Sequence, residues 1–151
     1  MTTAQEASFE PRMAAQKVSA KQYRAMIALE TSVELEPMLR HLVKIRASQI
    51  NGCAYCIWMH TGEARSDGED EQRIYALSAW HESPLFTPRE RAALALTESI
   101  TLVGETHVPD DVFAGAREHF DDEDLAQLVW SIITINAWNR LAITMRSKPG
   151  S

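Results

Sequence analysis

Apolar residues recur every three or four positions along most of the chain, which is the spacing of an amphipathic helix. In the segment MLRHLVKIRASQI, Leu39, Leu42 and Val43 follow this spacing, and Arg46 stands on the same apolar face. Runs in which apolar and polar residues alternate, as they do in a half-buried strand, are nearly absent. The pattern therefore predicts an all-α fold.

Helix start and stop signals divide the chain into six or seven helices. Thr87, Pro88 and Glu90 combine a capping hydroxyl, a proline in the first turn and a glutamate at the third helical position. Ser19 and Gln22 have the spacing of a capping box ahead of another helix. The expected helices cover 21–34, 38–50, 53 to about 68, 71–80, 88 to about 103, 111–120 and a last segment ending near 146. We expect a single domain over residues 1–151, with a core of about 19–146 and flexible ends.

The last helix is apolar around most of its circumference between Leu128 and Ile143. Its large apolar residues are Trp130, Ile132, Ile133, Ile135, Trp138 and Leu141. A helix that is apolar on all sides is buried either at the centre of a domain or between subunits. Because one small domain rarely covers a helix completely, we expect a homo-oligomer.

Composition and charge narrow the classes of function. The chain has 151 residues, 45% of them apolar, which is enough for one domain with a full core and no disulfide. Fifteen Lys and Arg against twenty-one Asp and Glu give a net charge of −6, without a basic stripe. Nucleic acid is bound through clustered positive charge, so we do not expect it as a partner.

Neither a targeting signal nor a membrane span is expected from the pattern. Residues 1–16 contain acidic residues and no apolar run, unlike a secretory signal or a transit peptide. The most apolar stretch, Leu125 to Met145, is interrupted by polar side chains that hydrocarbon would reject at a helix centre. We therefore expect a cytoplasmic protein with no membrane partner.

The motif that carries chemistry is Cys53-Ala54-Tyr55-Cys56, followed by His60. On a helix the two cysteines lie one turn apart on the same face, with a rise of about 4.5 Å, so their sulfurs can meet. His60 lies four residues after Cys56, where its imidazole can take the proton of that thiol. In a reducing compartment such a pair is typically redox-active or metal-binding. The motif therefore predicts a dithiol with a base beside it.

Two features favour different cysteines as the nucleophile. Cys53 sits closest to the start of the helix, where unpaired backbone amides lower the pKa of a thiol. Cys56 has the helical spacing to His60. The residues alone leave the choice open.

Other interpretations of the cysteines compete with a redox role. The pair could be structural, because free cysteine is a common buried residue. Zinc could bind Cys53, Cys56 and His60, but a fourth ligand would have to come from far away in the sequence. Attachment of c-type haem is excluded, because Ile57 rather than histidine follows Cys56.

The remaining candidates are weaker. Tyr55, Trp58 and Met59 are expected to form the wall of an apolar pocket. Glu98 is expected to be a charge on a helix surface. The chain has no glycine-rich phosphate loop and no serine nucleophile motif. We expect neither a cofactor nor a metal.

The stretch LRHLVKIRASQINGCAYCIWMH, the Thr-Pro-Arg-Glu-Arg helix and the closing NAWNR segment resemble the alkylhydroperoxidase D and carboxymuconolactone decarboxylase superfamily. The likeness spans roughly residues 35 to 145. It implies an all-helical fold, an obligate homo-oligomer such as a trimer or a hexamer, and a site near a subunit interface. The oligomer agrees with the apolar circumference of the last helix.

The resemblance also implies residue roles. Cys56 matches the peroxidatic cysteine, Cys53 the resolving cysteine, and His60 the histidine that relays protons. The implied activity is reduction of a small-molecule hydroperoxide, after which a protein or a small thiol restores the dithiol. The decarboxylase branch, which acts on a carboxylated lactone, generally lacks the cysteine pair, and it remains an alternative together with a non-catalytic oligomer.

The chain departs from the family pattern at two positions. The best-known peroxidases place a glutamate of the proton relay twelve residues before the first cysteine, and His41 occupies that position here. They can also carry a histidine between the cysteines, where this chain has Tyr55. We take His41 as a candidate member of the relay.

Overall fold

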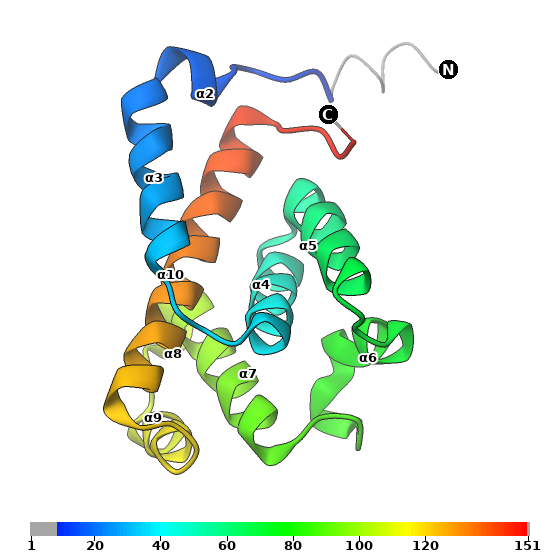
Figure 1. Cartoon of the computed structure of the whole chain (residues 1–151), viewed down its shortest axis with the longest axis vertical. Helices are drawn as coiled ribbons and strands as arrows, with labels where there is room; N and C mark the ends of the chain where they lie inside the picture. Colours follow the sequence, from blue (N-terminus) through cyan, green and yellow to red (C-terminus); the bar gives the residue numbers. More distant parts are fainter. Residues whose placement is uncertain (1–8, 151) are drawn as a thin grey trace.

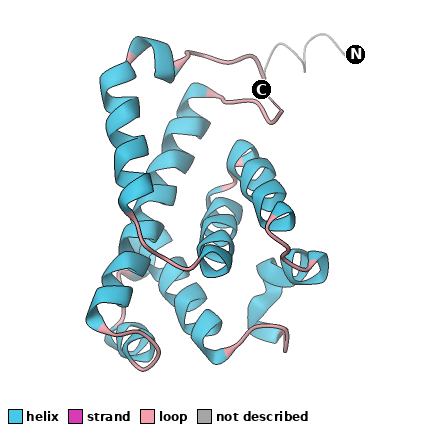
Figure 2. Cartoon of the chain, in the orientation of Figure 1, coloured by secondary structure: helices cyan, strands magenta, loops and turns pink. Residues whose placement is uncertain are grey.

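Residues 9–150 are described in the computed structural model, and they form helices and loops with no strand (Figure 2). The helices are α2 (Ala15–Val18), α3 (Ala20–Ser32), α4 (Pro37–Asn51), α5 (Ala54–Ser66), α6 (Glu71–Ala76), the 3-10 helix η1 (Leu77–Glu82), α7 (Pro88–Thr101), α8 (Val103–Thr106), α9 (Asp110–Arg117) and α10 (Asp122–Met145). The all-α prediction is confirmed.

Helix α4 lies at the centre and packs against α5, α7 and α10 (Figure 1). One side of α4 contributes Leu39 and Val43 to a core shared with α7, α9 and α10. The other side contributes Leu42 and Ile45 to a second core beneath α6 and η1. Since α4 is buried on several faces, its last turn and the cysteines that follow it are held in a fixed position.

Local caps explain most of the helix starts. Thr87 accepts a hydrogen bond from the Glu90 N–H at 3.2 Å, as predicted. Asp121 accepts from the Asp124 N–H at 2.8 Å and so begins α10. The predicted capping box at Ser19 is wrong: its hydroxyl donates to the Ala15 carbonyl at 2.7 Å. The reason is the short helix α2, which precedes Ser19 and competes for its side chain.

The segment expected as one helix over 71–80 is broken. Helix α6 ends at Ala76, and the chain continues as a 3-10 helix in which Ala79 has non-helical backbone angles. This places Trp80 in the core, where its indole N–H donates to Glu98 at 2.8 Å. Glu98 also accepts from Arg46 at 3.0 Å. Glu98 is therefore a partly buried partner of α4 rather than the surface charge that we expected.

Both described ends of the chain pack together at one end of α10 (Figure 1). The Arg12 N–H donates to the Met145 carbonyl at 2.9 Å, and Lys148 contacts Glu10 at 3.3 Å. Ala15 is buried, so packed structure begins ahead of the expected core start at residue 19. The outermost parts of the predicted flexible ends, residues 1–8 and 151, lie outside the described residues.

The apolar residues of helix α10 lie partly in the core and partly on the surface. Leu128, Ile132 and Ile135 are buried, whereas Trp130 and Ile133 remain 46% and 41% exposed. None of the helices within residues 9–150 is both long enough and apolar enough to cross a membrane.

The exposed pair on α10 leads to a prediction about assembly. Because Trp130 and Ile133 are adjacent on the helix surface, we expect them to be covered by a second copy of the chain. The native mass should then be a multiple of 17.0 kDa, and Trp130→Glu should lower it. Light scattering coupled to size exclusion measures both. Tyr75→Glu, at an exposed aromatic on α6, is the control, and a monomeric wild type would contradict the prediction.

Candidate functional site

The junction between α4 and α5 presents the cysteines. Gly52 ends α4 with a φ of 70°, a left-handed conformation that glycine adopts without strain. The Cys53 N–H then donates to the Ser48 carbonyl at 3.0 Å. Cys53 is the N-cap of α5, which begins at Ala54 rather than at Cys53, and its sulfur accepts from the Cys56 N–H at 3.4 Å. The N-cap and the first turn of α5 therefore hold the two cysteines.

The two sulfurs lie 2.6 Å apart, and both cysteines are free thiols. Cys53 is 1% exposed and Cys56 is 2% exposed. Both pack against Ala47 and Ile135. The predicted meeting of the two thiols is thus present in the structure, and any reagent must reach them through an opening in the protein.

The thiols differ in acidity. The hydrogen bond donated by the Cys56 thiol lowers the pKa of Cys53 to about 7, with further help from the backbone amide of Cys56. Donating that bond raises the pKa of Cys56, and burial raises it further. The pair of thiols therefore loses one of its two protons at neutral pH and keeps the other.

A cavity of about 580 Å³ reaches this site. Its lining includes Cys56 and His60 but, among the described residues, neither Cys53 nor His41. The apolar wall consists of Tyr23, Ile27, Tyr55, Met59, Trp138, Leu141 and Met145, and described residues near the two ends of the chain, among them Met13 and Ser147, line one side. The expected wall residue Trp58 instead points outward and is exposed. The two cysteines therefore differ in access from the cavity: Cys56 lines it, and Cys53 lies behind Cys56.

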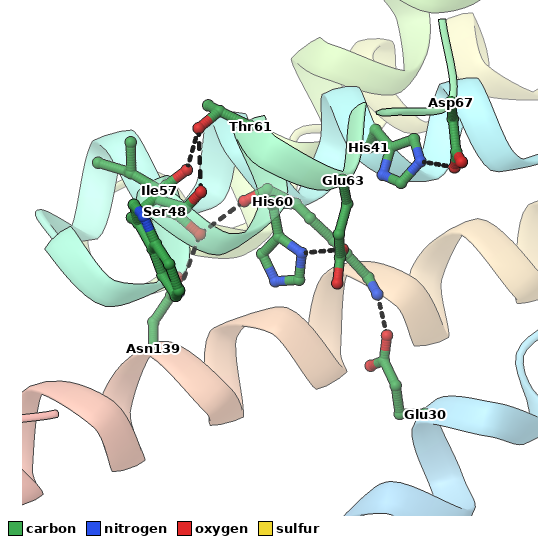
Figure 3. A network of polar contacts seen from close by, with 11 residues as sticks. Glu30, His41, Ser48, Ile57, His60, Thr61, Glu63, Asp67 and Asn139 are labelled. Atoms are coloured by element: carbon green, nitrogen blue, oxygen red, sulfur yellow. Dashed lines mark hydrogen bonds and ion pairs between the residues drawn. The ribbon is translucent and has the colours of Figure 1, made fainter. Parts of the chain in front are cut away.

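His60 is buried and oriented by a carboxylate (Figure 3). Its Nδ1 lies 2.9 Å from Oε2 of Glu63, three residues further along α5. When Nδ1 donates this bond, Nε2 carries the lone pair, and Nε2 is buried without a partner in the structure. The hydrogen bond from His60 lowers the pKa of Glu63 against the opposing effect of burial, and Lys44 and His41 add to the lowering.

His41 does not join this arrangement. Its Nε2 lies 2.6 Å from Oδ2 of Asp67, beyond the last turn of α5, and Figure 3 shows the pair apart from His60. Glu63 instead provides the carboxylate beside His60. Glu63 was not predicted from the sequence, although the spacing of three residues between a histidine and a glutamate on one helix indicates such a pair.

Two further charged residues line the cavity and were also missed. Lys44 of α4 is buried and forms an ion pair with Glu30 of α3. The second oxygen of Glu30 is buried without a hydrogen-bond partner. Nothing local in the sequence indicated this pair, because it joins helices that are brought together only by the fold.

The zinc alternative gains no support from this geometry. Within residues 9–150, no three His, Cys, Asp or Glu side chains come together in a set that could hold a metal ion. Cys53, Cys56 and His60 therefore do not converge on one point as zinc ligands do.

Comparisons with known proteins agree with this description. Residues 19–99, more than half of the chain, match the profile of the Carboxymuconolactone decarboxylase family. The uncharacterized protein YdfG of Bacillus subtilis (strain 168) is 52% identical over 112 residues, which cover 74% of this chain and 76% of YdfG.

Solved structures show the same fold. ATU0492 from Agrobacterium tumefaciens, a protein of unknown function whose name associates it with antioxidant defence and AhpD, matches with a TM-score of 0.91 and 43% identity, over 94% of this chain and 99% of that one. An uncharacterized peroxidase-related protein with an AhpD core from Ralstonia eutropha JMP134 matches with a TM-score of 0.79 and 22% identity, over 97% and 80% of the two chains. The second likeness shows the fold alone.

Proposed function

The chain belongs to the carboxymuconolactone decarboxylase family and has an AhpD-like fold, and on that basis we propose that it reduces hydroperoxides with the Cys53 and Cys56 dithiol. One observation carries the proposal: Cys56 and His60 border the same cavity, and the Cys53 sulfur lies 2.6 Å behind that of Cys56. A nucleophile, a base and a resolving thiol are thus adjacent.

The first step oxidises Cys56. His60 Nε2 takes a proton from the dithiol, and the carboxylate of Glu63 stabilises the resulting imidazolium. The proton that remains with the pair passes from Cys56 to the Cys53 sulfur as Cys56 attacks the terminal oxygen of the hydroperoxide, and an S–O bond forms as the O–O bond breaks. The imidazolium returns its proton to the departing alkoxide. The products are an alcohol and a sulfenic acid on Cys56.

The second step forms the disulfide. The Cys53 sulfur attacks the Cys56 sulfur, and the sulfenic hydroxyl leaves with a proton as water. Two thiols of an external protein or small-molecule donor then exchange with the disulfide and restore the dithiol. In sum, one hydroperoxide and two donor thiols become one alcohol, one water and one donor disulfide.

The direct test is thiol titration with mass measurement. Stoichiometric hydroperoxide should remove both thiols and lower the subunit mass by two hydrogens, because the sulfurs are already adjacent. Cys53→Ser should instead accumulate sulfenic acid on Cys56, and dimedone labelling would detect it. Cys56→Ser should react slowly, since Cys53 does not line the cavity.

Two results would contradict the proposal. Thiols that survive stoichiometric hydroperoxide in the wild type would show that the pair has no peroxidatic role. A Cys56→Ser variant that reacts at the wild-type rate would show that Cys53 is the nucleophile and that the assigned roles are reversed.

A further inference from the structure

The surroundings of the two sulfurs limit which external thiol can restore the dithiol. A reducing thiolate attacks one sulfur of a disulfide and forms a mixed disulfide, so it must reach bonding distance of that sulfur. It approaches from the side opposite the second sulfur, which leaves. Both cysteines are buried, so neither sulfur is presented on the protein surface. The path to each sulfur therefore decides which one is attacked and by what kind of donor.

The two sulfurs differ in what lies next to them. Cys56 lines the cavity of about 580 Å³. Cys53 does not line it and packs against Ala47 and Ile135, neither of which borders the cavity. A thiol that arrives through the cavity therefore meets the sulfur of Cys56, with Cys53 behind it.

Cys53 occupies a position that suits a leaving thiolate. It is the N-cap of α5, and its sulfur accepts from the Cys56 N–H at 3.4 Å. Backbone amides at the start of a helix stabilise a thiolate. A thiol with a stabilised thiolate also leaves faster in disulfide exchange. Attack on Cys56 thus expels the sulfur that the helix start already holds.

The outer part of the cavity is too narrow for a folded donor. The two described chain ends lie side by side there (Figure 1), and the Arg12 N–H donates to the Met145 carbonyl at 2.9 Å. The Arg12 guanidinium also donates to the Thr144 carbonyl at 3.2 Å. Both ends line the cavity, through Pro11, Met13, Ala14, Ser147 and Lys148. A cavity of this size holds a drug-sized molecule, whereas a protein domain could enter only after the ends separate.

We infer that a low-molecular-weight thiol reduces the disulfide through this cavity, by attack on the sulfur of Cys56. The inference rests on the proposed function only for placing the disulfide in a cycle. The donor thiolate bonds to the Cys56 sulfur as the bond between the cysteines breaks, and Cys53 leaves as a thiolate. A second donor thiolate attacks the donor sulfur of the mixed disulfide, and Cys56 leaves. Two electrons pass to the protein, and the protons of the donor thiols pass to the cysteines or to solvent.

The first test compares donors of different size. Diamide forms the disulfide in the wild type without any hydroperoxide. Dithiothreitol and thioredoxin then serve as the small and the folded donor, and each rate is divided by that of the same donor on an unhindered peptide disulfide. The relative rate of thioredoxin should be lower by about 30-fold, because thioredoxin waits for an opening that breaks both hydrogen bonds of Arg12. Equal relative rates, or two thiols that survive diamide, would overturn the inference.

The second test locates the attack. The oxidised wild type is exposed briefly to 2-mercaptoethanol, quenched with acid and alkylated. Fragment-ion mass spectrometry should find the donor on Cys56 and the alkyl group on Cys53, since only Cys56 lines the cavity among the two. A mixed disulfide found mainly on Cys53 would overturn the inference.

A matched pair of substitutions tests the route. Ala142 lines the cavity and packs against the cysteine cluster, so Ala142→Phe should slow reduction by dithiothreitol by about ten-fold or more. Ala54 is exposed in the first turn of α5 and does not line the cavity, so Ala54→Phe should leave the rate unchanged. Slowing in Ala54→Phe alone, or equal rates in both variants, would overturn the route. If Ala142→Phe does not fold, Leu141→Trp at another position of the wall should show the same slowing.

The two proposals fail differently. A disulfide that dithiothreitol reduces through Cys56, in a protein that does not consume hydroperoxide, would support the route and overturn the proposed function. A protein that consumes hydroperoxide, and whose disulfide reacts with thioredoxin as readily as with dithiothreitol on the relative scale, would overturn the inference alone.

Discussion

Replacing His60 with alanine should slow the reduction of hydroperoxide at neutral pH by about 100-fold or more, which is the contribution of a positioned general base. The reason is the buried Nε2 of His60, which has no hydrogen-bond partner while Nδ1 is held by Glu63, on the cavity that Cys56 also lines. The rate of sulfenic acid formation under single-turnover conditions measures the effect. His81→Ala is the control, because His81 is exposed and pairs with Glu98.

Glu63→Gln should have a smaller effect on the same rate, of about three-fold, because the Glu63 carboxylate is half exposed and water screens its charge. A glutamine can still accept the Nδ1 hydrogen but cannot stabilise the imidazolium by charge. If His60→Ala reacts within about three-fold of the wild type, the thiolate forms without a base and the relay is absent.

Replacing Lys44 with methionine should lower the free energy of unfolding by about 3 kcal/mol, which is at the lower end of the cost of breaking a buried ion pair. The variant leaves the Glu30 carboxylate without its partner beside the cavity. We place the effect at the lower end because Glu30 keeps some contact with solvent. Urea unfolding at neutral pH and a fixed protein concentration measures the change.

The double variant Lys44→Met with Glu30→Gln should recover part of this loss, since no uncompensated charge remains. Arg117→Ala breaks an exposed pair with Asp122 and should change the stability by less than about 1 kcal/mol. A double variant no more stable than Lys44→Met alone would show that the loss comes from packing rather than from charge.

The features that could be predicted from the sequence depend on contacts between residues that are close together in the chain. Helix starts such as Thr87 depend on contacts over three residues, and the dithiol depends on a spacing of three, which a helix converts directly into proximity. The cap at Ser19 was wrong because a second short helix, invisible in the pattern of apolar residues, lies next to it.

The remainder of the site depends on distant contacts. Lys44 meets Glu30 of another helix, and Asn139 meets Ser48 from 91 positions away. No spacing rule relates such residues. His41 shows the opposite limit. Its position relative to Cys53 suggested a role in the proton relay, but its imidazole is hydrogen-bonded to the carboxylate of Asp67 at the end of α5.

The single proton held between the two sulfurs also governs how the redox potential depends on acidity. Oxidising a fully protonated dithiol releases two protons with two electrons, so its potential falls by about 59 mV per pH unit. Above the pKa of Cys53, at about 7, one proton has already gone. The slope then halves to about 30 mV per pH unit. A donor dithiol that stays protonated in the same range therefore gains about 30 mV of driving force over this pair with each further pH unit. The reductive half of the cycle becomes easier as the medium turns alkaline.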